Sequence, residues 1–209
     1  MATADSLRIA LVAPPMLAVP PPTYAGTERV VGALAEELHR RGHRVTLFAP
    51  GDSEVSAELV PTVPRSLWSE DYRGDVSSFI NVTLAMVWRE HERFDVIHSH
   101  VETLGFLFAR HCPTPVVTTL HGRLDAWGIP ELITEFSDIP LVAISESQRR
   151  WAENANWVGT IHHGLPLEAM PFSELPRVRR AHHAGEGHRR LHRAGPTVET
   201  SAQDGRQGL

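Results

Sequence analysis

Short apolar runs alternate with amphipathic segments along most of the chain. Residues 7–12 form an apolar run that ends at two prolines, as a buried strand of a parallel sheet does. Residues 27–41 follow a proline-rich loop, and their apolar positions recur at helical spacing. Gly42 stands directly after them, where a glycine commonly ends a helix. The pattern therefore predicts a strand, a long loop and a helix at the start of the chain.

The same alternation predicts further strands and helices. Strands are expected at residues 43–49, 57–60, 94–100, 114–122, 139–145 and 157–166. Helices are expected at residues 77–90, 103–111, 130–136 and 146–153. Strands that alternate with helices are typical of a Rossmann-like, doubly wound parallel sheet, so we expect a single α/β domain. In such sheets ligands bind beyond the carboxyl ends of the strands, and the loops there are the candidate site.

Composition narrows the class of protein. The chain has 209 residues, of which 42% are hydrophobic, enough to bury the core of one ordinary domain. Its single cysteine, Cys112, excludes a disulfide framework and a cysteine-rich zinc site, and it indicates a reducing compartment. No apolar run reaches the roughly 18 residues of a membrane span, and the first residues lack the charged segment of a signal peptide. We therefore expect a cytoplasmic protein.

The last part of the chain differs in composition from the rest. All 20 basic residues are arginines, and residues 177–209 hold seven of them against three acidic residues, although the whole chain has a net charge of −5. This segment has no aromatic residue and no amphipathic period, so we do not expect it to pack. Two interpretations are open: a basic arm that binds nucleic acid or acidic membrane, and the product of a shifted reading frame in a GC-rich gene.

We favour the shifted frame, because such frames in GC-rich genes often stay open and encode arginine, histidine, alanine and glycine. The chain then divides into a Rossmann-like domain of residues 1–172 and a tail of residues 173–209. No nucleic-acid partner is expected under this interpretation. The coding DNA near the codon of Leu175 tests it, since another frame there should continue into a second folded domain.

Gly26 stands at the opening of the first predicted helix, after a loop of about a dozen residues. A helix N-terminus presents unpaired N–H groups and the positive end of the helix dipole, and glycine lets an anion approach the backbone. Gly26 is therefore a candidate for binding a phosphate group. The alternative is that it only turns the chain before the helix. Glu28 would oppose a phosphate if its side chain pointed inward.

Three histidines fall at strand ends. His98 and His100 are two residues apart, so their side chains share one face of the predicted strand. His121 ends the next buried strand, directly before a glycine. The set is compatible with a zinc site, with contacts to substrate hydroxyl or phosphate groups, and with a structural role. We favour substrate contact and give His121 the most weight, because its place at a strand end presents the imidazole to the crevice.

Other polar residues at strand ends carry weaker signals. Asp52 follows the second strand, where a dinucleotide-binding fold keeps a ribose-binding acid, but the three-glycine fingerprint is absent and a turn residue is the simpler interpretation. Ser145 is expected to cap the helix that starts at Glu146, and both residues also lie at the crevice. His162 and His163 mark the end of the last strand and the turn after it.

Taken in order, five segments resemble the N-terminal domain of family 4 glycosyltransferases. They are RIALVAPP with YAGTERVVGALAEELHRRGHRVTLFAPGDS, then DVIHSH, PVVTTLHG, LVAISESQRRW and IHHGLPLEAMPF, which together cover residues 7 to about 172. The resemblance implies the N-terminal half of a GT-B architecture, in which two Rossmann-like domains face each other. It also implies a retaining enzyme that transfers a sugar from a nucleotide-diphosphate sugar to an acceptor hydroxyl, without a metal or another cofactor.

The resemblance assigns roles to residues of this sequence. Gly26, with Thr27 beside it, matches the glycine whose backbone approaches the donor diphosphate, although Ala25 stands where the family usually has a first glycine. His121 matches the histidine that reaches the transferred sugar, and it is the expected catalytic residue. The acceptor side of the cleft is expected to be formed by Tyr24, His98, His100, Ser145 and Glu146.

The resemblance places the family's remaining donor-binding residues in a C-terminal domain, as an Arg/Lys pair and an E-x7-E motif. This chain changes to its arginine-rich tail where that domain would begin, so we predict little or no sugar transfer by the chain alone. Two alternatives stay open: a non-catalytic binding domain that kept the fold, and a metal hydrolase built on the three histidines. Further partners under consideration are a membrane surface contacted peripherally and a second copy of the chain.

Overall fold

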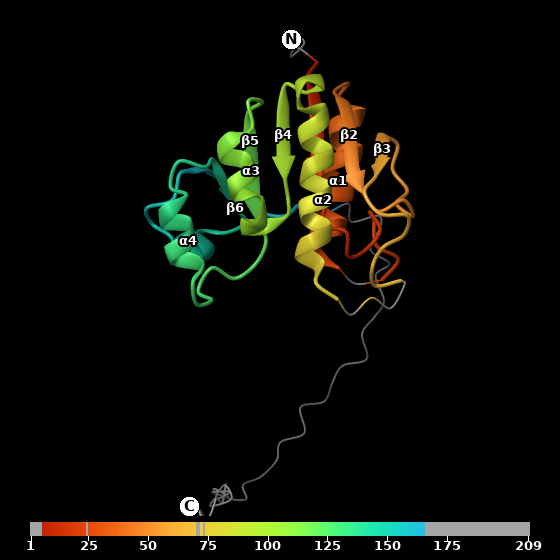
Figure 1. The fold of residues 1–209 in the computed structure, drawn as a ribbon. Helices are drawn as coiled ribbons and strands as arrows, with labels where there is room; N and C mark the ends of the chain where they lie inside the picture. Colours follow the sequence, from red (N-terminus) through yellow and green to blue (C-terminus); the bar gives the residue numbers. More distant parts are fainter. Residues whose placement is uncertain (1–5, 24, 70–71, 73, 166–209) are drawn as a thin grey trace, which may run out of the picture. The chain divides into compact units, whose positions relative to one another are not determined.

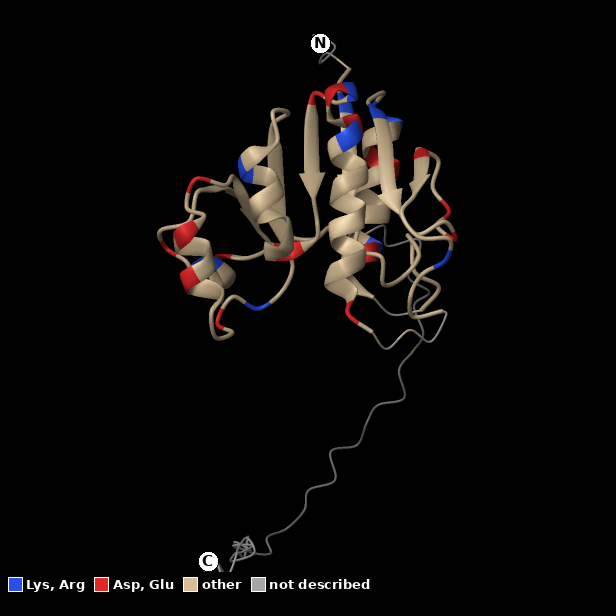
Figure 2. Ribbon diagram, in the orientation of Figure 1, with Lys and Arg blue, Asp and Glu red and all other residues tan. Residues whose placement is uncertain are grey.

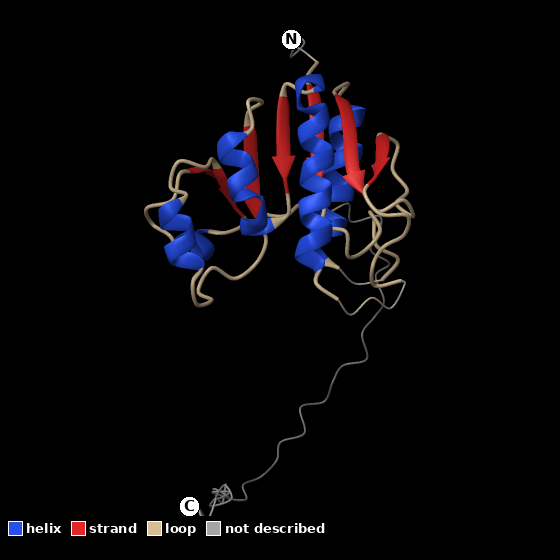
Figure 3. Ribbon diagram, viewed as in Figure 1, coloured by secondary structure: helices blue, strands red, loops and turns tan. Residues whose placement is uncertain are grey.

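The computed structural model describes residues 6–23, 25–69, 72 and 74–165. Within these residues the chain forms one parallel sheet of seven strands in the order β3-β2-β1-β4-β5-β6-β7 (Figures 1 and 3). The strands are β1 (Arg8–Val12), β2 (Arg44–Ala49), β3 (Glu58–Pro61), β4 (Val96–Ser99), β5 (Val116–Leu120), β6 (Leu141–Ala143) and β7 (Trp157–Thr160). The reversal of strand order on either side of β1 is that of a doubly wound fold, and the predicted fold class is confirmed.

Helices connect the strands and cover both faces of the sheet (Figure 1). They are α1 (Gly26–Arg40), α2 (Val76–Glu90), α3 (Phe106–His111), α4 (Ile129–Glu135) and α5 (Glu146–Arg149), with two 3-10 turns, η1 (His91–Arg93) and η2 (Glu102–Gly105). In β1, Ile9 and Leu11 pack with α1 on one face, whereas Ala10 and Val12 pack with α2 on the other. Burial on both faces explains the unbroken apolar run of this strand.

The helix ends follow from local chemistry. Gly42 has a φ of 89°, in the left-handed region that glycine adopts without a steric penalty, and it ends α1 as predicted. At the start of α2, the carboxylate of Asp75 accepts a hydrogen bond from the backbone N–H of Ser77. Figure 2 shows that charged residues lie at the ends of α2, and its middle part is uncharged. On that uncharged part Val82 is exposed, and Trp88 is exposed in the last turn, directly before Arg89.

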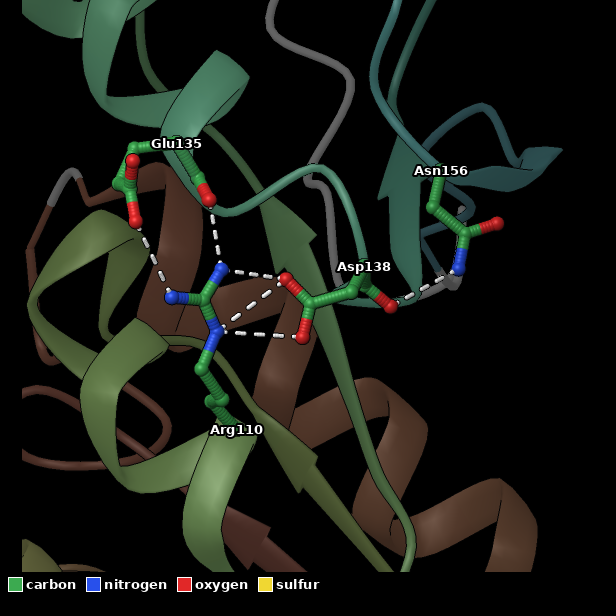
Figure 4. A network of polar contacts seen from close by, with 4 residues as sticks. All are labelled: Arg110, Glu135, Asp138 and Asn156. Atoms are coloured by element: carbon green, nitrogen blue, oxygen red, sulfur yellow. Dashed lines mark hydrogen bonds and ion pairs between the residues drawn. The ribbon is translucent and has the colours of Figure 1, made fainter.

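A polar network fixes the outer strands and α4 to the centre of the fold (Figure 4). The guanidinium group of Arg110, on α3, binds both carboxylate oxygens of Asp138, the carboxylate of Glu135 and the backbone carbonyl of Glu135. It also lies 4.1 Å from the ring centroid of Phe136. The side-chain amide of Asn156 donates to the carbonyl oxygen of Asp138 at 3.1 Å. Arg110 therefore joins α3 to the connection that leads into β6.

The described residues bear on two further expectations, the absence of a membrane span and the position of the tail. Among those residues, none of the helices has both the length and the apolar character needed to cross a membrane. The expected tail, residues 173–209, lies outside them, so the boundary at residue 172 stays a prediction.

Candidate functional site

The carboxyl edge of the sheet gathers the histidines that the sequence singled out. Strand β4 carries His98 and is followed directly by His100, and His121 follows the adjacent strand β5. The ring centroids of His98 and His100 are 4.1 Å apart, which confirms that the two side chains share a face. Because parallel strands end at the same edge, neighbouring strands bring residues that are far apart in sequence into contact.

A row of imidazoles runs from the protein interior to its surface, and we call His98, His100, His121 and His163 the histidine row. Nδ1 of His100 lies 2.9 Å from Nε2 of His121, and Nδ1 of His121 lies 3.3 Å from Nε2 of His163. Nε2 of His98 lies 2.8 Å from the hydroxyl oxygen of Thr119. His100 is 1% exposed and His163 is exposed, so the row joins a buried ring to a solvent-facing one.

Burial keeps the histidine row uncharged at neutral pH. It lowers the pKa of His98 to about 4 and that of His121 to about 4. Burial and the neighbouring rings hold the pKa of His100 well below its usual value, and burial lowers that of His163. A neutral imidazole has one donor and one acceptor, which suits a hydroxyl group better than a phosphate that needs positive charge. Among the described residues, no three histidine, cysteine, aspartate or glutamate side chains are arranged to hold a metal ion.

Two side chains that the sequence did not single out hold the backbone around His121. The carboxylate of Glu102 accepts a hydrogen bond from the N–H of His121 at 2.9 Å. The side-chain amide of Gln148 donates to the carbonyl oxygens of Leu120 and Gly122 at 2.9 and 2.8 Å. The position of Glu102, just past a strand end, was the one available signal, and nothing in the sequence connects Gln148 to His121.

The N-terminus of α1 also lies at this edge (Figure 1). The helix starts at Gly26 itself, and Ala25 before it makes no side-chain capping bond, so no cap of its own occupies the first N–H groups. Gly26 is exposed, and a Cβ atom there would meet nothing within 4 Å. Glu28 is buried, which raises the pKa of its carboxyl group. No described contact joins Gly26 or Thr27 to the histidine row.

The remaining candidate site residues do not lie together in the structure. Ser145 caps α5 by accepting a hydrogen bond from the N–H of Gln148, as predicted. Glu146 is exposed at the start of that helix, 3.7 Å from Arg149. Asp52 accepts hydrogen bonds from the N–H and the hydroxyl of Ser66, which agrees with the turn interpretation. Tyr24 lies outside the described residues.

Comparison with solved structures finds proteins of similar fold. HepE from Anabaena, in complex with UDP and glucose, is similar with a TM-score of 0.52 and 12% identity over 78% of this chain and 46% of that one. AviGT4, a glycosyltransferase involved in avilamycin A biosynthesis, has a TM-score of 0.46 and 20% identity over 74% of this chain and 41% of that one. The chain thus spans less than half the length of these structures. At such identities the likeness to HepE shows the fold alone.

Comparison of the sequence with known proteins gives the family. No curated protein matches the chain. The family model described as Glycosyltransferase Family 4 matches residues 24–198, a range that begins at the loop before α1, contains both His100 and His121, and extends into the expected tail. This range is most of the chain. The chain therefore belongs to glycosyltransferase family 4.

Proposed function

We propose that this chain forms the N-terminal half of a retaining glycosyltransferase, which transfers a sugar from a nucleotide-diphosphate sugar to an acceptor hydroxyl. One observation carries the proposal: a neutral His121 is held at the same edge of the sheet as the uncapped N-terminus of α1. The first group suits a sugar hydroxyl, and the second suits a phosphate. The presence of UDP and glucose in the HepE structure supports a donor of this class.

The groups at the carboxyl edge of the sheet have separate roles in the proposed reaction. The N–H groups at Gly26 and Thr27 face the donor diphosphate, where the helix dipole favours negative charge. His121 makes a hydrogen bond to the transferred sugar and orients it for reaction. We assign the acceptor side to the segments that carry Tyr24, His98, His100, Ser145 and Glu146, with the buried His100 acting behind His121 and not in direct contact with the acceptor.

Among the described residues, the groups at this edge of the sheet offer little positive charge to a leaving diphosphate. The histidine row is neutral, so it does not supply that charge at neutral pH. The guanidinium group of Arg29 donates to the carbonyl oxygens of Pro21 and Thr23, and Arg123 forms an ion pair with Asp125. Stabilising the charge that develops on the leaving group is usually the largest part of catalysis. We therefore propose that a second domain supplies this charge and that the chain alone transfers little or no sugar.

Calorimetry and a transfer assay test the proposal together. The purified chain is titrated with a panel of nucleotide sugars, with and without a supplied C-terminal domain of a family 4 enzyme, and sugar transfer is measured in parallel. We expect binding and transfer only in the presence of both halves. The variant His121→Ala should abolish transfer, whereas the matched control His162→Ala, at an exposed residue close to the row in sequence, should leave it intact. Robust transfer by the chain alone would refute the proposal that a second domain is needed for transfer.

Two alternatives give different results in the same experiments. A non-catalytic binding domain would bind a sugar or nucleotide without transfer, even when the second domain is supplied. A metal hydrolase built on His98, His100 and His121 would carry a bound metal ion after purification, and metal analysis detects that directly. The direct hydrogen bond between His100 and His121 favours the transferase over the hydrolase, because it occupies nitrogens that a metal would need.

We further propose two partners for the chain, a second copy of itself and a membrane surface that it contacts peripherally. The tryptophans Trp127 and Trp151 follow β5 and β6, and their exposed fractions are 101% and 54%. Exposed aromatic side chains are typical of a surface that another protein surface covers. Sedimentation of the purified chain measures self-association, and flotation with anionic vesicles measures membrane contact. A monomer that stays below the vesicles would contradict both.

A further inference from the structure

The turn that carries His121 is held from two sides by side chains from distant parts of the sequence. On one side, Oε1 of Glu102 accepts the N–H of His121 at 2.9 Å, and the N–H of Gly122 also bonds to this carboxylate. On the other side, Nε2 of Gln148 donates to the carbonyl oxygens of Leu120 and Gly122. The backbone groups around His121 are thus bonded to side chains where the chain leaves β5.

Glu102 adopts a backbone conformation that is unfavourable for its residue type. Its φ is 54°, and it is the only non-glycine residue with a positive φ among those the structure describes. Such a conformation costs free energy and persists where the surrounding contacts require it. The same carboxylate lies close to Gly122, since a Cβ atom there would be 3.7 Å from Oε2 of Glu102. The strained residue therefore places a carboxylate directly beneath the His121–Gly122 turn.

The side chain of Gln148 also bonds to the backbone of this turn. Its side chain is buried, and besides the two bonds that Nε2 donates, Oε1 accepts the N–H of Ile144 at 2.9 Å. Because the nitrogen faces two carbonyl oxygens and the oxygen faces an N–H, only one orientation of the amide satisfies all three bonds. A buried amide with each bond made keeps a fixed position.

The His121 ring is held in addition by its neighbours. Its Nε2 faces the buried His100, whereas its Nδ1 faces the exposed His163. A ligand that reaches the site from solvent can replace His163 but not His100. With the backbone fixed by the turn contacts, Nδ1 is the ring nitrogen on the solvent side.

We propose that Glu102 and Gln148 are positioning residues, which hold the His121 backbone so that Nδ1 of its ring faces the substrate. This inference rests on the proposed function only in taking His121 as the substrate-contacting group. Glu102 holds the N–H groups of the turn and Gln148 holds its carbonyl groups. Loss of either contact frees the turn and lets the ring leave its place beside His100.

The test uses nuclear magnetic resonance of the isotopically labelled chain and needs no substrate. The variants are Glu102→Ala, which removes the acceptor, and Gln148→Met, which keeps the length of the side chain but removes the donating nitrogen and adds no charge. Glu131→Gln, at an exposed position on α4, is the matched control. The observables are the hydrogen-exchange rates of the His121 and Gly122 amides and the pKa of the His121 ring.

We expect exchange at these two amides to become at least about tenfold faster in Glu102→Ala than in the control, because a buried bond to a carboxylate is lost. The pKa of His121 should rise from about 4 toward 6.5 in both variants, since a freed ring becomes hydrated. A merely structural role for Glu102 or Gln148 would lower stability without moving the ring pKa. Unchanged exchange and an unchanged pKa in a folded variant would overturn the proposal.

A second pair of variants keeps the test decisive if Glu102→Ala does not fold. Glu102→Gly removes the same carboxylate but accepts a φ of 54° without strain, so it should be more stable than Glu102→Ala and show the same ring pKa change. Glu102→Gln keeps one acceptor oxygen and should give a smaller change. A Glu102→Gly protein in which His121 behaves as in the control would refute the positioning role. Failure of the sugar-transfer assay would leave these results unaffected, so the two proposals fail separately.

Discussion

Mild acid should destabilise this protein, because the buried histidine row must stay uncharged in the folded state. His98 has a pKa of about 4 when folded, against 6.5 in an unfolded chain. Between these values the unfolded chain binds a proton that the folded chain does not, so stability falls as pH falls. The full effect of His98 is about 3 kcal/mol, and about 2 kcal/mol of it is lost between about pH 7 and about pH 5.

The variant His98→Gln isolates this contribution. Glutamine can still make a hydrogen bond to Thr119 but does not titrate, so the loss of stability between about pH 7 and about pH 5 should be about 2 kcal/mol smaller than in the parent. Urea denaturation at both pH values measures the difference. The control His111→Gln, at an exposed residue at the end of α3, should lose as much stability as the parent. An unchanged pH dependence in His98→Gln would refute the claim that this ring is buried in its neutral form.

Three further changes test the packing of the fold by chemical denaturation. Leu141→Ala empties a fully buried position in β6 and should cost about 2–5 kcal/mol, and a cost below about 1 kcal/mol would contradict its place in the core. Gly42→Ala puts a Cβ at a φ of 89° and should cost about 1 kcal/mol, whereas equal stability would show that the helix end can rearrange. Arg110→Lys keeps the charge but loses the forked contact to Asp138 and the stacking on Phe136, so it should lower the free energy of unfolding by about 1 kcal/mol. Unchanged stability would mean that the positive charge alone is enough to hold this contact.

The order of strands and helices was predictable because the inner strands, such as β1 and β5, are largely buried and read as apolar runs, whereas the edge strands β3 and β7 have no fully buried residue. Element ends were less predictable. The strand expected at residues 114–122 ends at Leu120, because the N–H groups of His121 and Gly122 bond to Glu102 instead of a neighbouring strand. The helix expected at residues 103–111 is divided into η2 and α3.

Only the local contacts of the site were predictable from the sequence. His98 and His100 could be paired from their spacing of two, since that spacing is local. Contacts between Glu102 and His121, and between Gln148 and Gly122, span 19 and 26 residues. Such contacts depend on how neighbouring strands are aligned, which residue types alone do not determine. The role of Gly26 as a phosphate site stays a prediction.

The most direct test of the central claim is sugar transfer by this chain combined with a separately produced C-terminal domain of a family 4 enzyme. A radiolabelled nucleotide sugar reports transfer to acceptor, with the chain alone, the second domain alone, and both together. We expect product only from the combination, and none when the chain carries His121→Ala. Product from the chain alone, or equal product with and without the His121 side chain, would contradict this claim.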